Sequence, residues 1–205
     1  MIHSIAAALI SLVMGFGANQ PHPEMPQGHP QPEGVPSGHP DIVERENDPE
    51  IVEPPEADPA DVASIDAIVG AYYDSLSGPK GEERDWDRLR SIFQPMARLV
   101  AARPVRGDHS GIWVMELEEF IAFNKSVMER GGFFEREISR KTETFGNIAH
   151  VWSTYESRRA ASDPEPYSRG IYSVQLLRDG DRWWIVSVYW DYERADSPIP
   201  PAYLP

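Results

Sequence analysis

The clearest alternation of hydrophobic and polar positions lies near the end of the chain, over residues 169–192. Two runs in it, 171–177 and 182–191, are rich in the β-branched and aromatic residues that favour strands. Between them, Asp179-Gly180 supplies a glycine that can take the positive φ of a tight turn. The pattern predicts a β-hairpin.

The second strand of this hairpin is apolar on both faces. Strict alternation divides its side chains into two sets. The first set is Trp183, Ile185, Ser187, Tyr189 and Asp191, and the second is Trp184, Val186, Val188 and Trp190. A strand of this kind lies inside a structure, or has one face in a core and the other in a pocket or against a partner. We expect the first set to line a pocket and the second to contact another copy of the chain in a homodimer.

Three stretches repeat apolar residues at steps of three and four, as amphipathic helices do. They cover residues 58–77, 85–94 and 115–130. Asp58 and Asp85 are suitable N-caps for the first two, because an aspartate side chain accepts hydrogen bonds from the first backbone amides of a helix. The sequence therefore predicts three helices.

The remaining segments predict strands and loops. Residues 97–103, 133–145 and 148–159 read as strands, whereas 104–111 and 160–167 read as loops. The order is helix, helix, strand, helix and then four antiparallel strands, which is typical of an α+β domain whose sheet packs one face on a helical layer.

This order and the ending Asp179-Gly180-Asp181-Arg182-Trp183-Trp184-Ile185-Val186 resemble the nuclear transport factor 2-like superfamily, including its polyketide cyclase-like branch. The resemblance covers residues 58 to about 193. It implies an α+β fold in which a curved antiparallel sheet packs on three helices and forms a cone with an internal pocket. Isomerases, dehydratases, cyclases, non-catalytic binders and dimerisation modules share that fold, so the resemblance does not select one function.

The N-terminal region differs in character from the rest. An uncharged apolar run over residues 5–16 ends in small residues, which predicts a signal peptide at 1–18 and export to the periplasm or the exterior. An uncleaved anchor is the alternative, but the run is shorter than the roughly 20 residues that span a bilayer. After cleavage we expect no stable membrane span.

Residues 19–57 read as a disordered linker, because proline and acidic residues dominate and apolar content is low. Gly28-His29-Pro30 recurs there as Gly38-His39-Pro40. The histidines could bind a transition metal loosely, but a plain spacer is the favoured interpretation because no spacing defines a coordination geometry. The folded domain is predicted at 58–195, followed by a proline-rich tail at 196–205.

Charge and composition exclude several classes of function. The net charge of -14 disfavours nucleic acid, whose phosphates are bound by lysine and arginine. The absence of cysteine rules out disulfides, thiolate metal sites and cysteine nucleophiles. The sequence also lacks HExxH, Gly-x-Ser-x-Gly and a phosphate-binding glycine loop, so we predict neither a metal site nor a cofactor.

The resemblance implies that a catalytic member transfers protons with an Asp, His or Tyr inside the cone. If the face of Trp183 looks inward, burial raises the pKa of Asp191 and makes it a candidate general base. His150 is a candidate partner, although a histidine on a half-buried strand more often has a structural role. The catalytic candidates are Asp191, His150 and Tyr189, and the ligand-binding candidates are Trp183, Ile185, Tyr72 and Ser187.

Other charged residues on predicted strands are interpreted as structural. Glu135, Glu137 and Glu156 are further candidate acids, but a solvated or salt-bridged strip is the favoured interpretation of the strand face that Glu135 and Glu137 share. Three arginines bracket the loop at 160–167, namely Arg158, Arg159 and Arg169. They could bind a carboxylate bidentately, but balancing nearby acids is the favoured interpretation.

Two functions follow from these patterns. The first is an exported, non-enzymatic domain that binds a small apolar or amphipathic molecule in its cone, dimerises through its sheet, or does both. The alternative is a cofactor-free enzyme of the isomerase, dehydratase or cyclase type. The first is favoured because no catalytic constellation is complete in the sequence.

Overall fold

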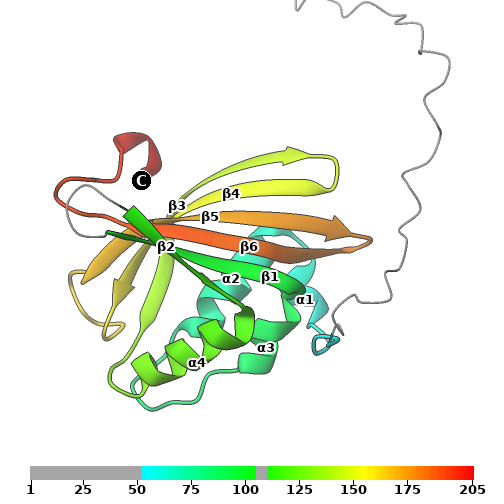
Figure 1. Ribbon diagram of the computed structural model, residues 1–205, viewed down its shortest axis with the longest axis horizontal. Coiled ribbons are helices and arrows are strands. Elements are labelled where there is room, and N and C mark those ends of the chain that lie inside the picture. The colour runs from blue at the N-terminus through cyan, green and yellow to red at the C-terminus, as the bar shows by residue number, and fades with distance from the viewer. Residues whose placement is uncertain (1–51, 105–109) are drawn as a thin grey trace, which may run out of the picture. The chain divides into compact units, whose positions relative to one another are not determined.

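The structure, a computed structural model, describes residues 52–104 and 110–205 (Figure 1). The signal peptide expected at 1–18 lies outside the described residues, and so do nearly all of the expected linker and most of the loop expected at 104–111. The described chain forms an α+β domain, as predicted. None of its helices is long and apolar enough to cross a membrane.

The helices all precede the last four strands. They are α1 (Pro59–Val62), α2 (Ile65–Leu76), α3 (Trp86–Ser91) and α4 (Leu117–Met128). Asp58 and Asp85 cap α1 and α3 as predicted, each accepting a backbone N–H on its side chain. The single helix expected over 58–77 is divided because Ser64 takes an extended conformation and caps α2.

Six strands form one sheet in the order β2-β1-β6-β5-β4-β3. Their bounds are β1 (Phe93–Pro104), β2 (Ser110–Met115), β3 (Phe134–Phe145), β4 (Ile148–Arg158), β5 (Ser168–Asp179) and β6 (Arg182–Tyr192). The pair β1 and β6 is parallel and the other pairs are antiparallel. The expectation that residues 110 and 111 belong to a loop and that a helix begins at 115 is wrong, because β2 occupies 110–115.

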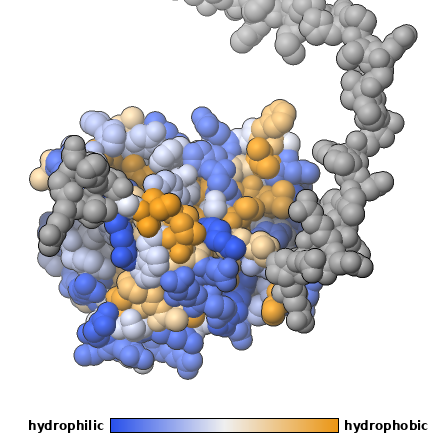
Figure 2. Space-filling model, viewed as in Figure 1, coloured by the Kyte–Doolittle hydropathy of each residue, from blue (hydrophilic) through white to orange (hydrophobic). Residues whose placement is uncertain are grey.

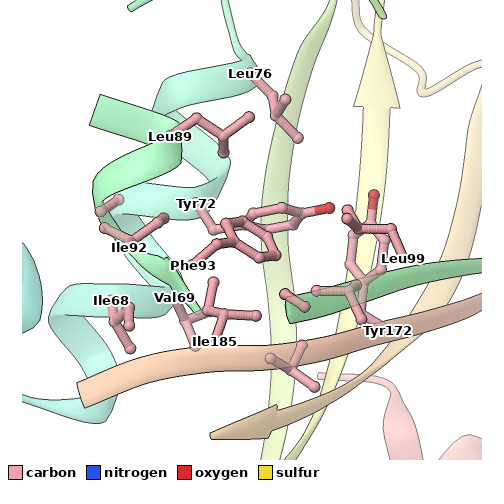
Figure 3. Packing of buried hydrophobic residues seen from close by; sticks show 14 of the residues in the cluster. Ile68, Val69, Tyr72, Leu76, Leu89, Ile92, Phe93, Leu99, Tyr172 and Ile185 are labelled. Carbon is pink, nitrogen blue, oxygen red and sulfur yellow. The ribbon is translucent and has the colours of Figure 1, made fainter. Parts of the chain in front are cut away.

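The helices lie on one side of the curved sheet, and the C-terminal segment lies on the other (Figure 1). We call the side that faces the helices the inner face and the opposite side the outer face. The hydrophobic core fills the space between helices and inner face. In it, Tyr72 of α2 packs edge-on against Phe93 and Tyr172, and Leu99 and Ile185 lie on the neighbouring strands (Figure 3).

The strand β6 contains a β-bulge that decides which way its side chains point. Leu176 pairs with Ile185, but Gln175 pairs with Ser187, so Val186 is an extra residue on β6. Ile185 and Val188, three positions apart, are therefore both buried, whereas Val186 is 39% exposed.

The two faces predicted by strict alternation are consequently wrong. Beyond the bulge the faces exchange, so Val188 and Trp190 belong to the core. The surface predicted to contact a second subunit thus loses two of its four members, and Val186 is the exposed one. Tyr189 and Asp191, predicted to line the cone, point to the outer face instead.

The C-terminal segment packs against the outer face. Ile199 is buried, and the short helix η1 (Pro201–Tyr203) places the Tyr203 ring 5.8 Å from that of Trp152. The Thr154 hydroxyl donates to the Tyr203 carbonyl at 2.7 Å. Elsewhere the surface is mostly polar, with apolar residues over β2 and toward the hairpin tips (Figure 2).

Candidate active site

A cavity of about 260 Å³ lies between α4 and the inner face of the sheet. Its walls are mainly aromatic and aliphatic, which suits an apolar molecule. The principal wall residues are Trp113, Phe120, Phe133, Tyr155, Tyr172 and Trp190. The cavity also contains one buried carboxyl group, that of Glu135.

Local structure holds Glu135 rigidly. On β3 its neighbour Arg136 points to solvent, so the Glu135 side chain points inward, where it is 6% exposed. The Ser77 side chain, just after α2, accepts from the Glu135 backbone N–H at 3.0 Å and lies 3.2 Å from its carbonyl oxygen. The end of α2 is thereby tied to the residue that carries the carboxyl group.

Two hydroxyl groups bind the Glu135 carboxyl group. Ser157 Oγ donates to Oε1 at 2.8 Å, and Tyr172 Oη donates to Oε2 at 2.8 Å. Burial raises the pKa of Glu135 to about 7, although both hydrogen bonds act to lower it. A carboxyl group with such a pKa can release or accept a proton at neutral pH.

Tyr155 lines the same cavity and has an unsatisfied hydroxyl donor. Its ring stacks on Tyr172 with centroids 4.4 Å apart, and its buried hydroxyl has no hydrogen-bond partner among the described residues. Burial, together with the negative charge of Glu135, raises the pKa of Tyr155, so the hydroxyl keeps its proton. An unpaired buried donor costs about 1–3 kcal/mol, and a ligand oxygen would satisfy it.

Gly170 provides the space for this hydroxyl. A Cβ at position 170 would lie 2.4 Å from Tyr155 Oη and 2.4 Å from the Asp191 carbonyl oxygen. Glycine is therefore needed here for close approach and not for its backbone conformation.

The structure places the predicted catalytic residues on the outer face. Tyr189 and Asp191 border a separate pocket of about 290 Å³ beneath the C-terminal segment. Burial acts to raise the pKa of Asp191, but hydrogen bonds from Arg194 and the Tyr192 amide outweigh it and the pKa is lowered. Asp191 thus stays ionised in an ion pair with Arg194.

His150 also lies on the outer face, away from Glu135. Its Nε2 is 2.9 Å from Ser173 Oγ, and its ring packs against Trp152. No hydrogen bond joins His150 to Asp191 among the described residues. The predicted pair therefore shares a face of the sheet but does not converge in the cone.

None of the four predicted ligand-binding residues borders the inner cavity. Tyr72 and Ile185 fill the core (Figure 3). Trp183 packs against the core, and Ser187 follows the bulge toward the outer face. Tyr72 comes nearest to the expected role, because its hydroxyl is also buried without a partner.

Sequence reasoning named Glu135 but interpreted it as part of a solvated strip. That interpretation is wrong for Glu135. It is closer to the structure for Glu137, which forms an ion pair with Arg140. Counting back from the turn would not have found this site, because a register irregularity between Glu137 and Ser139 is what pairs Glu135 with Ser157. Of the arginines near the loop, Arg158 pairs with Glu156 as the favoured interpretation had it. Arg169 pairs instead with Glu193, and Arg159 stacks on Tyr167.

The described residues bring together no three histidine, aspartate or glutamate side chains in a metal-binding group. What the cavity offers is one buried carboxyl group, hydroxyl donors and apolar walls.

Comparison with known proteins yields likeness of structure without likeness of sequence. No protein-family model matches the sequence, and no curated protein does. A protein from Nostoc punctiforme with a cystatin-like fold is 12% identical, with a TM-score of 0.49, over 64% of this chain and 90% of its own. An NTF-2 like protein from Silicibacter pomeroyi is 20% identical, with a TM-score of 0.43, over 64% and 94%.

A third similar structure is an NTF2-like protein of Pseudomonas putida, 12% identical, with a TM-score of 0.47, over 62% of this chain and 82% of its own. All three are described as proteins of unknown function, so the likeness says nothing about a ligand or a reaction. Two of these three structures are described as NTF2-like, the superfamily that the sequence resembles.

Proposed function

We propose that the inner cavity binds one small, largely apolar molecule and that Glu135 moves a proton on it without a cofactor. The observation that carries the proposal is the buried Glu135 carboxyl group, with a pKa of about 7, in an aromatic cavity that also holds the unpaired Tyr155 hydroxyl. A base near neutrality and a fixed donor for a developing negative charge are what proton abstraction beside a carbonyl needs.

The steps are assigned as follows. The ionised Glu135 takes a proton from the carbon next to a carbonyl group, so that the C–H bond breaks and an O–H bond forms on the carboxylate. The electron pair moves to the carbonyl oxygen, and Tyr155 donates a hydrogen bond to it. Return of the proton to a different carbon gives isomerisation, whereas loss of a hydroxide that takes up the proton gives dehydration.

Ligand binding is tested with the neutral fluorophore N-phenyl-1-naphthylamine, whose emission rises in an apolar site. We expect saturable binding by the purified protein. Proton transfer is tested by incubating the protein with cyclic ketones in D2O and following deuterium uptake at the α-carbon by NMR.

Glu135→Gln is the matched variant for that exchange. It keeps the size of the side chain, so it should retain the fluorophore and lose the deuterium exchange, by about 100-fold or more. Ketones that bind without any exchange above the buffer rate would refute the catalytic role and leave a non-catalytic binding protein, the function that the sequence favoured.

Association of two copies is a second proposal, now through a different part of the outer face. Register aligns Val114, Val100 and Tyr189 in one row across β2, β1 and β6, and Val114 and Tyr189 are 48% and 45% exposed. Sedimentation of the wild type and of Val114→Glu measures this. A monomeric wild type would contradict it.

We also propose that the domain acts after export. The support is the apolar run at 5–16, and the expected mature chain begins close to residue 19. Mass spectrometry of the protein from its source organism reports the cleavage, and an intact N-terminus would contradict it.

A further inference from the structure

The opening of the inner cavity carries positive charge. Arg103 on β1 lines the cavity, and its Cζ lies 4.2 Å from the centroid of the Trp113 ring, the geometry of a cation–π contact. Arg103 is exposed and Trp113 half-buried, so the pair marks the side of the cavity that is open to solvent.

The Trp113 ring is itself fixed. Its Nε1 donates to Glu119 at 3.2 Å, and its ring packs at 88° to that of Phe123 with centroids 5.0 Å apart. A guanidinium group held over an aromatic ring can still direct N–H groups to a planar oxyanion. Arg103 forms no ion pair with another described residue.

A second cation stands over another wall residue. Tyr167 lines the cavity and is 47% exposed, and Arg159 Cζ lies 4.1 Å from its ring centroid. Two aromatic residues at the opening thus each carry a guanidinium group, in a protein whose net charge is -14. The positive charge of these two groups is opposite in sign to the net charge of the chain and would attract an anion locally.

Strand register sets the distance between the opening and the polar centre. Ala101 pairs with Trp190, so Arg103 lies level with Tyr192, which pairs with Gly170 beneath the Tyr155 hydroxyl. Two strand spacings separate the backbones of Arg103 and Gly170, about 10 Å. That is the length of a bicyclic aromatic acid or a medium-chain acid.

We propose that the ligand is an amphipathic carboxylate, held by Arg103 through its carboxylate and reaching Tyr155 and Glu135 with an oxygen-bearing group at its other end. The inference rests on the proposed function of the inner cavity. Arg103 is the specificity-determining residue, with Arg159 adding charge at the same opening, and it selects an anion over an isosteric neutral molecule.

Calorimetric titration with two probes tests this. 6-Hydroxy-2-naphthoate has the required length, with a carboxylate at one end and a hydroxyl at the other, and 6-hydroxy-2-naphthamide is its neutral isostere. We expect the wild type to bind the carboxylate about tenfold more tightly than the amide, as a charge-assisted bidentate hydrogen bond provides.

Arg103→Gln should remove about tenfold of the affinity for the carboxylate and change that for the amide by less than about twofold. Arg98→Gln is the matched control. Arg98 precedes the buried Leu99 and forms an ion pair with Glu116, so this variant removes the same charge from the outer side and should leave both affinities unchanged.

The outcomes separate the two proposals. Equal binding of both probes, no effect of Arg103→Gln, or an equal effect of Arg98→Gln overturns the carboxylate inference while the cavity stands. Binding of N-phenyl-1-naphthylamine without binding of the carboxylate also overturns it. If that fluorophore does not bind either, the proposed function of the cavity is refuted as well.

Discussion

At the scale of single residues, the site depends on two polar groups whose burial lowers the stability of the fold. The Glu135 carboxyl group is buried beside Tyr172, and the Tyr155 hydroxyl is buried without a partner. Neither arrangement benefits stability, since burial disfavours the ionised carboxylate and leaves the hydroxyl unsatisfied. Perturbed groups that converge in a cavity are typical of functional sites.

Glu135 makes stability depend on pH in a direction opposite to that of a salt-bridged acid. Its pKa is about 7 in the folded protein against an ordinary value of 4.5, so the folded state binds more protons between those values. Stability is therefore greatest below the lower pKa and falls as pH rises toward the higher one. Above it, the loss levels off at about 3 kcal/mol.

Glu135→Gln should remove this dependence. Urea unfolding of both proteins should show the stability of the variant, relative to the wild type, rising by about 2 kcal/mol between pH 5.5 and pH 8. All other groups cancel in that difference. Parallel stability curves would show that Glu135 titrates normally and would remove the basis for its catalytic role.

Gly170 is a residue where a single added methyl group should have a large effect. Gly170→Ala puts a Cβ against a backbone oxygen and the Tyr155 hydroxyl, each 2.4 Å away, and should destabilise the protein by about 2 kcal/mol or more. Gly70→Ala, inside α2 with open space around it, should instead stabilise by about 0.5–1 kcal/mol. Equal effects in urea unfolding would contradict the close approach.

At the scale of elements, local signals were readable and non-local ones were not. Asp58 and Asp85 cap helices as predicted, because a cap depends on residues two or three apart in sequence. The parallel pairing of β1 with β6 joins residues about ninety apart, such as Leu99 and Val188, and no local pattern encodes it. The strand β2 was missed for a similar reason, since it is short and lies at a sheet edge.

The bulge at Val186 is the reason why the predicted catalytic residues of β6 do not lie in the inner cavity. Apolar residues occupy both the odd and the even positions of β6. A strand with a bulge and a strand without one would therefore bury comparable numbers of them. The sequence could predict the hairpin but not which side chains of β6 face the core. Every face assignment beyond residue 186 changed sides for that reason, including those of Tyr189 and Asp191.

Two matched substitutions test the bulge. Val188 is fully buried and Val186 is 39% exposed, so Val188→Ala should cost about 2 kcal/mol of unfolding free energy and Val186→Ala less than about 0.5 kcal/mol. Strict alternation would put both valines on one face and predict similar costs. Urea unfolding distinguishes the two arrangements.

At the scale of the whole domain, the two faces of the sheet have separate coverings. Helices enclose the inner cavity, and the segment after β6 covers part of the outer face, where Ile199 is buried and Tyr203 lies between Trp152 and Lys141. The proline content of the last residues predicted a tail but not its docking, because docking depends on side chains of β3 and β4. The sheet lies between this segment and the proposed site.

Removal of residues 197–205 should therefore affect stability and spare the site. It exposes the outer face and loses the burial of Ile199, worth about 1.5–3 kcal/mol, along with the hydrogen bond from Thr154. Urea unfolding should show that loss, and Ile199→Ala in the full chain should reproduce most of it. Binding of N-phenyl-1-naphthylamine should change by less than about twofold, because the cavity walls belong to the inner face. A truncated protein that stays folded by circular dichroism but no longer binds the fluorophore would show that the outer segment controls the cavity.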